Sequence, residues 1–182
     1  MVAIVSTDIA YRYSTKLGAA GNATASSAAA SLGTYISTTA WTGGAANDLF
    51  PDITGAQNAA SQVDYSCIFI YNSNAANAYQ NAVVYISAET AGGASIALAP
   101  DTTATSALGS AAAQAGNIAT STTAPTTVGA FSSPTTAGTG LVMASVPVGN
   151  VKAFWIKRTA ANTAALTNDG VTISTSGDTG SL

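Results

Sequence analysis

Histidine is absent from this 182-residue chain, and cysteine occurs once, as Cys67. Without histidine the chain has no Ser–His or Cys–His nucleophile, and it lacks the commonest general base and metal ligand. A single cysteine also excludes a disulfide bond within the chain. Because Cys67 precedes the apolar residues Ile68, Phe69 and Ile70, we expect it to be a buried, unreactive thiol. These absences predict a protein that is not an enzyme.

Charged residues are scarce as well: they make up 7% of the chain, whereas ordinary soluble proteins have about 25%. The formal net charge is −3, and the five basic residues are scattered. Electrostatic binding to nucleic acid normally needs a basic stripe, so we expect no nucleic-acid partner. Sparse charge also gives little repulsion between copies. It favours a homo-oligomer or a part of a larger assembly over an ordinary soluble β domain with a Ser/Thr coat.

Long hydrophobic runs are missing too. No segment approaches the roughly 18 consecutive apolar residues of a membrane span, so we expect no membrane partner. The N-terminal stretch has neither the basic start nor the long apolar middle of a signal peptide, and we do not expect one here.

Short β-branched and aromatic runs are what the chain has instead. Alanine, threonine, serine and glycine supply more than half of the residues, and the bulky apolar side chains gather at 65–71 and 82–86. Such side chains fit a pleated, half-buried surface. We interpret the two runs as a hairpin around an Asn- and Ala-rich tip, at the centre of an all-β domain.

Further strand-like segments surround this pair, with Gly, Pro and Asn between them. They cover residues 4–16, 32–39, 94–99, 127–131, 141–146, 151–158 and 171–176. Seven to nine short strands of this kind predict an antiparallel β-sandwich, jelly-roll-like, with long Ala/Thr/Ser-rich loops or arms. Residues 54–60 are expected to form one short helical turn.

The segments 141–146 and 151–158 read as a second hairpin, turned at Pro147–Asn150. Within 151–158, alternation places Val151, Ala153 and Trp155 on one face and Phe154 and Ile156 on the other.

The chain reads as one domain in two parts: residues 1–46 form an N-terminal strand and a small-residue arm, and residues 47–182 form the β-sandwich domain. A Thr/Ala/Ser tract runs from Thr102 to about Gly140, which is too long for an idle loop. We expect it to be either surface loop or an arm that becomes ordered on a neighbouring molecule, and its length favours the arm. The tail after Ser176 is expected to be loose.

Acidic residues are the remaining source of chemistry. Asp48 and Asp52 could act as a glycosidase pair, but capping and turn formation are commoner roles for Asp in a proline-containing connector. Asp48, Asp52 and Asp64 could hold calcium, although their spacing matches no EF-hand loop. We therefore predict no catalytic residues, no metal and no cofactor.

Aromatic side chains are the candidate contact residues. Trp41, Tyr71, Tyr79 and Trp155 could stack on sugars, but packing in a core or an interface is the commoner use of such residues. We take Trp41, Tyr79 and Trp155 as candidate interface anchors, provided that they are not part of the core.

Five stretches in order resemble a family of small virion structural proteins of tailed bacteriophages. They are NDLFPDITGAQNAASQVDYSCIFIYN, NAVVYIS, FSSPTTAGTGL, VPVGNVKAFWIKRT and NDGVTIS, and together they span about Asn47 to Asp178. The most specific parts are the LFPDITGA segment from Leu49 to Ala56 and the WIKR segment from Trp155 to Arg158.

The resemblance implies a β-sandwich protein of the virion, made in the host cytoplasm and without an enzymatic site. It would be a capsid-decorating or cement protein that binds the head surface, or alternatively a tail, neck or fibre component with a receptor- or glycan-binding surface. Its partners would be other virion proteins, the major capsid protein above all, and further copies of itself. We expect a homotrimer or a similar oligomer, because such sandwiches often pack around threefold axes.

Overall fold

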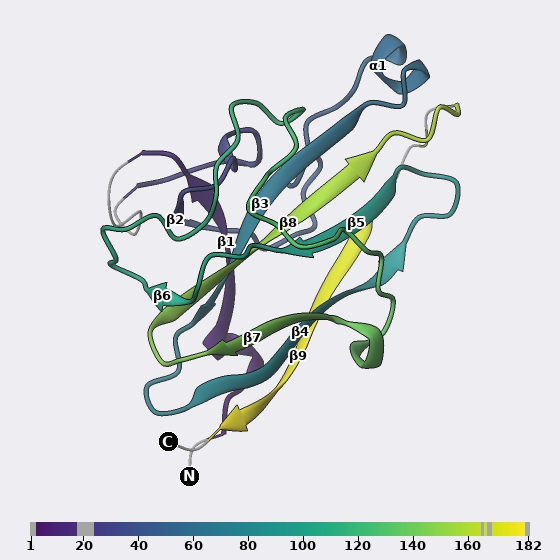
Figure 1. The fold of residues 1–182 in the computed structure, drawn as a ribbon. Helices are drawn as coiled ribbons and strands as arrows, with labels where there is room; N and C mark the ends of the chain where they lie inside the picture. The colour runs from purple at the N-terminus through teal and green to yellow at the C-terminus, as the bar shows by residue number, and fades with distance from the viewer. Residues whose placement is uncertain (1–2, 18–23, 165, 167–168, 181–182) are drawn as a thin grey trace.

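The computed structural model describes residues 3–17, 24–164, 166 and 169–180, and over these residues the chain forms an all-β sandwich (Figure 1). The strands are β1 (Ile9–Thr15), β2 (Tyr35–Ala40), β3 (Val63–Asn72), β4 (Ala78–Glu89), β5 (Ser95–Pro100), β6 (Ser106–Ala107), β7 (Leu141–Val146), β8 (Asn150–Thr159) and β9 (Val171–Gly180). The helical turns are η1 (Ser6–Asp8), η3 (Ala28–Ala30), α1 (Gly55–Ala59) and η4 (Ala137–Thr139). None of the described helices is long and apolar enough to cross a membrane.

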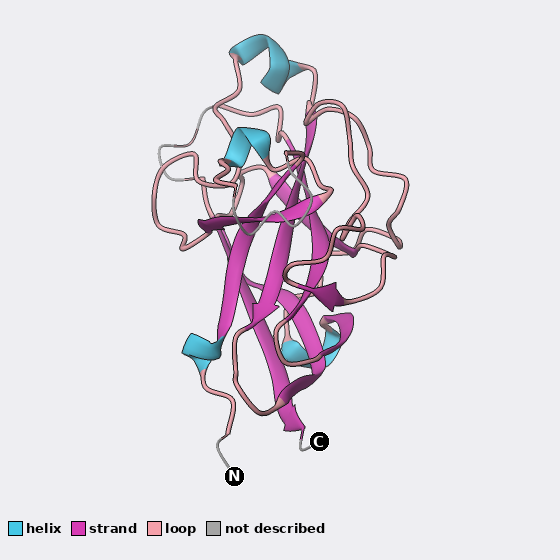
Figure 2. Cartoon of the chain, turned by 90° about the vertical axis from the view of Figure 1, so that its left-hand side faces the viewer, coloured by secondary structure: helices cyan, strands magenta, loops and turns pink. Residues whose placement is uncertain are grey.

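The strands form two antiparallel sheets that pack face to face. The larger sheet has the order β2-β1-β3-β8-β5, with β6 also paired to β8, and the smaller has the order β7-β4-β9. Figure 2 shows the strands filling the middle of the molecule and the short helices lying outside them. The all-β antiparallel sandwich predicted from the sequence is therefore confirmed.

β3 and β8 lie side by side in the larger sheet, and both are apolar on both faces. Their register pairs Ile68 with Phe154 and Cys67 with Trp155. The first pair points into the core between the sheets and the second into a separate core on the outer face. The two faces predicted for 151–158 are confirmed, and burial on both sides explains why these strands read as continuous apolar runs.

The core between the sheets is filled by alternate residues of the strands on either side. β4 contributes Ala82, Val84 and Ile86, and β7 contributes Met143 and Val146. Val171 and Ile173 pack against the same core from one face of β9. This core holds the smaller sheet on the larger one.

The Thr/Ala/Ser tract covers the other face of the larger sheet. Ala115 and Ile118 are buried against Phe69 and Trp155. Bridges join Gly33 to Asn117, Asp101 to Val128 and Leu98 to Ser132. Of the two expected roles, surface loop or arm ordered on a neighbour, the arm is wrong for these parts of the tract: they are ordered on their own sheet, where they bury apolar side chains that would otherwise face solvent. The strand expected at 127–131 is reduced to the bridge at Val128.

The buried carboxylate of Asp101 fixes this tract. Its Oδ2 accepts hydrogen bonds from Trp155 Nε1 at 2.8 Å, the Gly116 amide at 3.0 Å and Thr127 Oγ1 at 3.1 Å. Its Oδ1 accepts one from the Thr103 amide at 2.8 Å. Lys152 Nζ donates to the Asp101 carbonyl at 2.7 Å; burial lowers the pKa of this amine, and Asp101 opposes the shift.

Neither of the two hairpins expected from the sequence is formed. β3 and β4 lie in different sheets, and so do β7 and β8, so both links are corners that carry the chain from one sheet to the other. Buried Asn72 joins the two corners: its Nδ2 donates to the carbonyls of Asn77 at 3.0 Å and Val146 at 2.9 Å, and its own carbonyl accepts from Gly149 at 2.9 Å. A hairpin would leave this amide without those partners.

Both ends of the chain belong to the sheets. The strands expected within 4–16 and 32–39 are present as β1 and β2, and β1 pairs with both β2 and β3 in the larger sheet. Residues 18–23 of the expected N-terminal arm lie outside the described residues. β9 continues to Gly180 beside β4, so the tail after Ser176 is strand and not loose as far as that residue.

Asp101→Ala tests the carboxylate as the clamp of the tract. We expect the free energy of unfolding to fall by about 3 kcal/mol or more, because hydrogen bonds to a charged acceptor are lost and their donors stay buried. Urea unfolding followed by circular dichroism measures the change. Asp178→Ala, at an exposed carboxylate, is the matched control and should stay within about 0.5 kcal/mol of the parent chain. Equal effects of the two substitutions would contradict the assignment.

Cys67 should react slowly with thiol reagents in the native protein. The side chain is fully buried, and burial followed by the nearby Asp101 carboxylate raises the pKa of the thiol, so little thiolate forms. Labelling with a chromogenic disulfide reagent should become fast only when denaturant is added. Rapid labelling without denaturant would show that β3 is not buried as described.

Candidate functional site

A hollow of about 1090 Å³ is lined by residues of the connector that leads into α1. Figure 1 shows α1 at the end of the sandwich opposite the start of β1 and the end of β9. The walls of the hollow come from three parts of the chain that are distant in sequence. They are the connector from Trp41 to Asn58, the β4–β5 turn around Gly93, and the segments that follow β8 and precede β9. The outermost loops of the two sheets thus enclose one polar depression.

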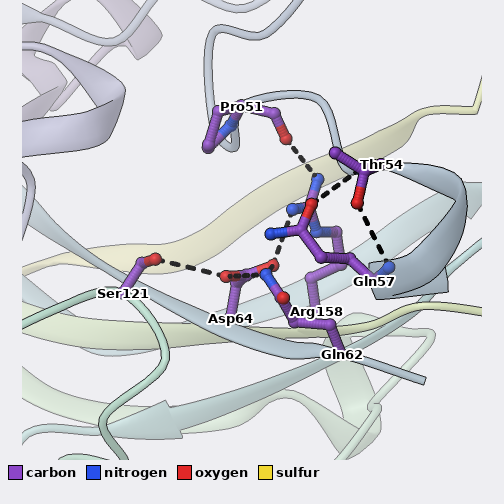
Figure 3. A network of polar contacts seen from close by, with 7 residues as sticks. All are labelled: Pro51, Thr54, Gln57, Gln62, Asp64, Ser121 and Arg158. Carbon is purple, nitrogen blue, oxygen red and sulfur yellow. Dashed lines mark hydrogen bonds and ion pairs between the residues drawn. The ribbon is translucent and has the colours of Figure 1, made fainter. Parts of the chain in front are cut away.

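The connector wall is held by the ion pair between Arg158 and Asp64 (Figure 3). Arg158 Nη2 lies 2.7 Å from Asp64 Oδ2, and Nη1 donates to the Pro51 carbonyl at 2.9 Å. The guanidinium also lies 4.7 Å from the centre of the Phe50 ring. Asp64 accepts further hydrogen bonds from Gln62 and Ser121. Because Arg158 belongs to β8 and Asp64 to β3, this wall is fixed to the two central strands.

The same connector continues into α1, which begins as the sequence predicts. Thr54 is the N-cap: its hydroxyl accepts from the Gln57 amide at 3.2 Å, and Gln57 Oε1 accepts from the Thr54 amide at 2.7 Å. This capping box satisfies two amides of the first turn. The short helix thereby gives the rim of the hollow a defined shape.

The opposite wall is tied together by two carboxylates. Glu89 accepts from the Ile96 amide at 2.7 Å, and Asp169 accepts from the Ala94 amide at 2.8 Å. A Cβ placed at Gly93 would lie 2.0 Å from Asp169 Oδ1, so the Asp169 side chain would have to move for a larger residue there. The hydrogen bond from the Ala94 amide to Asp169 joins the β4–β5 turn to the segment before β9.

Three buried polar atoms of hollow-lining residues have no hydrogen-bond partner among the described residues. They are Trp41 Nε1, Asp48 Oδ2 and Arg158 Nε. A buried polar group left in this state costs about 1–3 kcal/mol. Two donors and one acceptor, all covered by the surrounding protein, are in this state among the residues of the hollow.

The structure separates the acids that the sequence grouped. Asp48 and Asp52 both line the hollow, whereas Asp64 pairs with Arg158, so the trio considered for calcium is not assembled. In the part of the chain that the structure describes, no three His, Cys, Asp or Glu side chains come together to hold a metal.

The three candidate interface anchors end up in different places. Trp155 is fully buried, and its indole donates to Asp101. Tyr79 is 5% exposed, its hydroxyl lies 3.1 Å from Thr175 Oγ1, and burial raises its pKa. Neither has free surface on this chain, and both serve the core instead. Trp41 is only half-buried and lines the hollow, so it is the one of the three that reaches solvent.

Sequence reasoning missed Arg158, Glu89 and Asp169 as parts of this site. Arg158 was noted only within the WIKR segment, and the two acids stand alone in polar stretches. They meet because β3 pairs with β8 and β4 with β9, and no local pattern signals such distant pairing.

Comparisons with protein-family models, with curated proteins and with solved structures found no match to this chain. The resemblance to virion proteins of tailed phages accordingly rests on the five stretches of sequence given above. Its functional content is a proposal, which the surface of the molecule can support or oppose.

Asp64→Ala tests whether the ion pair holds the connector wall. The substitution leaves the Arg158 guanidinium without its counter-ion, and we expect a loss of about 3 kcal/mol in the free energy of unfolding. Amide hydrogen exchange should also become faster in α1 and the connector than in β5. Asp52→Ala, at an exposed position of the same connector, should change neither quantity. Unchanged exchange in α1 of the Asp64 variant would contradict this role.

Proposed function

We propose that this chain is a structural component of a bacteriophage particle, namely a capsid-decorating protein that binds the head surface and stabilises it. It acts by association and not by catalysis. The observation that carries the proposal is how little charge the folded surface presents. The sequence resemblance agrees with it and supplies the kind of particle.

Folding makes the sparse charge of the sequence sparser still at the surface. Asp64, Asp101 and Lys152 are buried, and each is engaged in a hydrogen bond or an ion pair inside the fold. The charged side chains that are well exposed are Lys16, Asp52, Glu89, Asp169 and Asp178. Such a surface provides little repulsion against close packing with other proteins.

The outward face of the β7-β4-β9 sheet is the part of this surface best suited to contact. Most side chains that alternate with the buried ones there are uncharged, namely Val83, Tyr85, Ser87, Val142, Ser174 and Ser176, and the exposed carboxylate of Asp178 lies near the end of β9. Val142 is 69% exposed, so its aliphatic side chain is free to contact another molecule. Contacts made by this face would be apolar and hydroxyl-mediated, so they should persist in high salt.

The partners on this proposal are the major capsid protein and further copies of this chain, arranged as a homotrimer. The virion is the location, after synthesis in the host cytoplasm. The tract between Thr102 and Gly140 does not take part as an arm, because it is used within the chain. On this proposal the outward face of the β7-β4-β9 sheet makes the contacts with neighbouring molecules that the arm was expected to make.

Val142→Lys tests the association. We expect the parent chain to form an oligomer by light scattering and to co-sediment with phage particles lacking it, in low and in high salt. A lysine at position 142 places a charge in the contact and should weaken co-sedimentation at least tenfold. Thr126→Lys adds the same charge on the tract that covers the other sheet, and it should bind as the parent does. A stable monomer that does not bind the particles would reject the proposal.

A further inference from the structure

We propose that the outer edge of β9 pairs with β9 of a second copy of this chain, antiparallel and about a twofold axis at Ser174. The smaller sheets of the two copies then form one continuous sheet of order β7-β4-β9-β9-β4-β7. This contact goes beyond the decorating role. It is made by main-chain hydrogen bonds between two copies, and it needs neither the capsid nor the Val142 side chain.

Both edges of the larger sheet are closed by other parts of the same chain. On β2, the Ile36 amide donates to Gln114 Oε1 at 3.0 Å. On β5, Leu98 and Ser132 exchange two main-chain hydrogen bonds, at 2.7 and 2.9 Å. Cover of this kind keeps an edge strand from pairing with other chains.

β9 has no such cover on the side away from β4. The Gly170 carbonyl accepts from the Thr90 amide at 2.9 Å, which places it on the β4 side. Strand alternation then turns the N–H and C=O groups of Ile173 and Thr175 away from β4. Among the described residues, none outside β4 makes a hydrogen bond to a main-chain group of residues 171–177. This edge offers donors and acceptors whose complement is another extended strand.

The sequence of β9 also lacks the residues that usually protect an edge. Residues 171–177 contain no proline and no charged side chain, and four of the seven are β-branched. β7, the other edge strand of the smaller sheet, is less suited to pairing. It has six residues, its register on β4 shifts at two places, and Ala144 has a φ of 62°.

A second copy of β9 complements the first. With Ser174 opposite Ser174 of the other copy, Ile173 lies opposite Thr175, and β-branched pairs of this kind stabilise antiparallel strands. Asp178 is the single charged residue of β9, and in this register it falls opposite Gly170. The two Asp178 carboxylates therefore stay apart, and no like charges meet across the pair.

The pairing also enlarges the outward face of the smaller sheet. A twofold axis normal to the sheet keeps the outward faces of both copies on the same side. The largely uncharged face that carries Val142 then extends over two copies. If copies also meet at a threefold contact, the β9 pair joins two trimers, because a twofold pair is a separate contact.

Analytical ultracentrifugation of the full chain tests the register. Ser174→Lys sets two lysines opposite each other, so it should halve the mass in solution, from dimer to monomer or from hexamer to trimer, and raise the dissociation constant at least tenfold. Ser174→Glu should do the same, and an equal mixture of the two variants should regain the parent mass. Ser87→Lys is the matched control: Ser87 Oγ lies 2.8 Å from Ser174 Oγ, but on β4, so this variant should keep the parent mass.

Ser174→Cys gives a second, geometric measurement. Directly opposite residues that are not hydrogen-bonded have Cα atoms about 4.5 Å apart, within the roughly 4.4–6.8 Å that a disulfide spans. The native Cys67 is fully buried and should not interfere. With oxidised glutathione as the oxidant, Ser174→Cys should form a disulfide-linked dimer, whereas Ser87→Cys should not. Thermal unfolding checks that each variant folds.

The outcomes separate this contact from the decorating role. A monomeric parent chain, or a Ser174→Lys variant that keeps the parent mass, would overturn the β9 pairing. So would a lysine and glutamate mixture that stays at half the mass, or a Ser174→Cys variant that is not cross-linked. Loss of the oligomer in Val142→Lys but not in Ser174→Lys would place the contact on the outward face instead. Co-sedimentation with particles bears on the decorating role alone.

Discussion

The β3–β8 pair at the centre of the larger sheet is apolar on both faces, and the other elements of the fold are placed so that they cover both. Ile68 and Phe154 point to one side, and Phe69 and Trp155 to the other. The β7-β4-β9 sheet covers the first side. The second is covered by a tract with almost no regular structure, which stays in place because the Asp101 carboxylate binds its backbone and side chains. A charge-poor chain thus places one of its few carboxylates where it binds three separate points of this loop, at Thr103, Gly116 and Thr127.

Residue pattern predicted the strands well and their partners poorly. Alternation in 151–158 identified both of its buried faces, and Thr54 marks the start of the short helix. The two supposed hairpins failed, because nearness in sequence says nothing about whether consecutive strands share a sheet. The deciding group is the Asn72 side chain, which binds both corners at once. In the sequence it is one of several asparagines at a polar tip.

The candidate site was visible only in part for the same reason. Trp41 and Asp48 could be named in advance, since an aromatic and an acid in a loop are ordinary candidates for contact. Arg158 joins them only because the register of β3 on β8 sets it opposite Asp64. Glu89 faces the hollow because it pairs with Val171, more than eighty residues away. A binding surface built from strand register has no signature in any single stretch of sequence.

The pairing of β3 with β8 and of β4 with β9 also sets the order in which the protein can fold. Val63 pairs with Thr159, and Glu89 pairs with Val171, so neither sheet is complete until most of the chain has left the ribosome. Before that point β3 can pair only with β1, and its apolar residues remain uncovered on the side where β8 will pair. Such non-local topology folds slowly and leaves strand edges open to other nascent chains. Until β8 is available to pair with β3, folding of this protein therefore competes with aggregation.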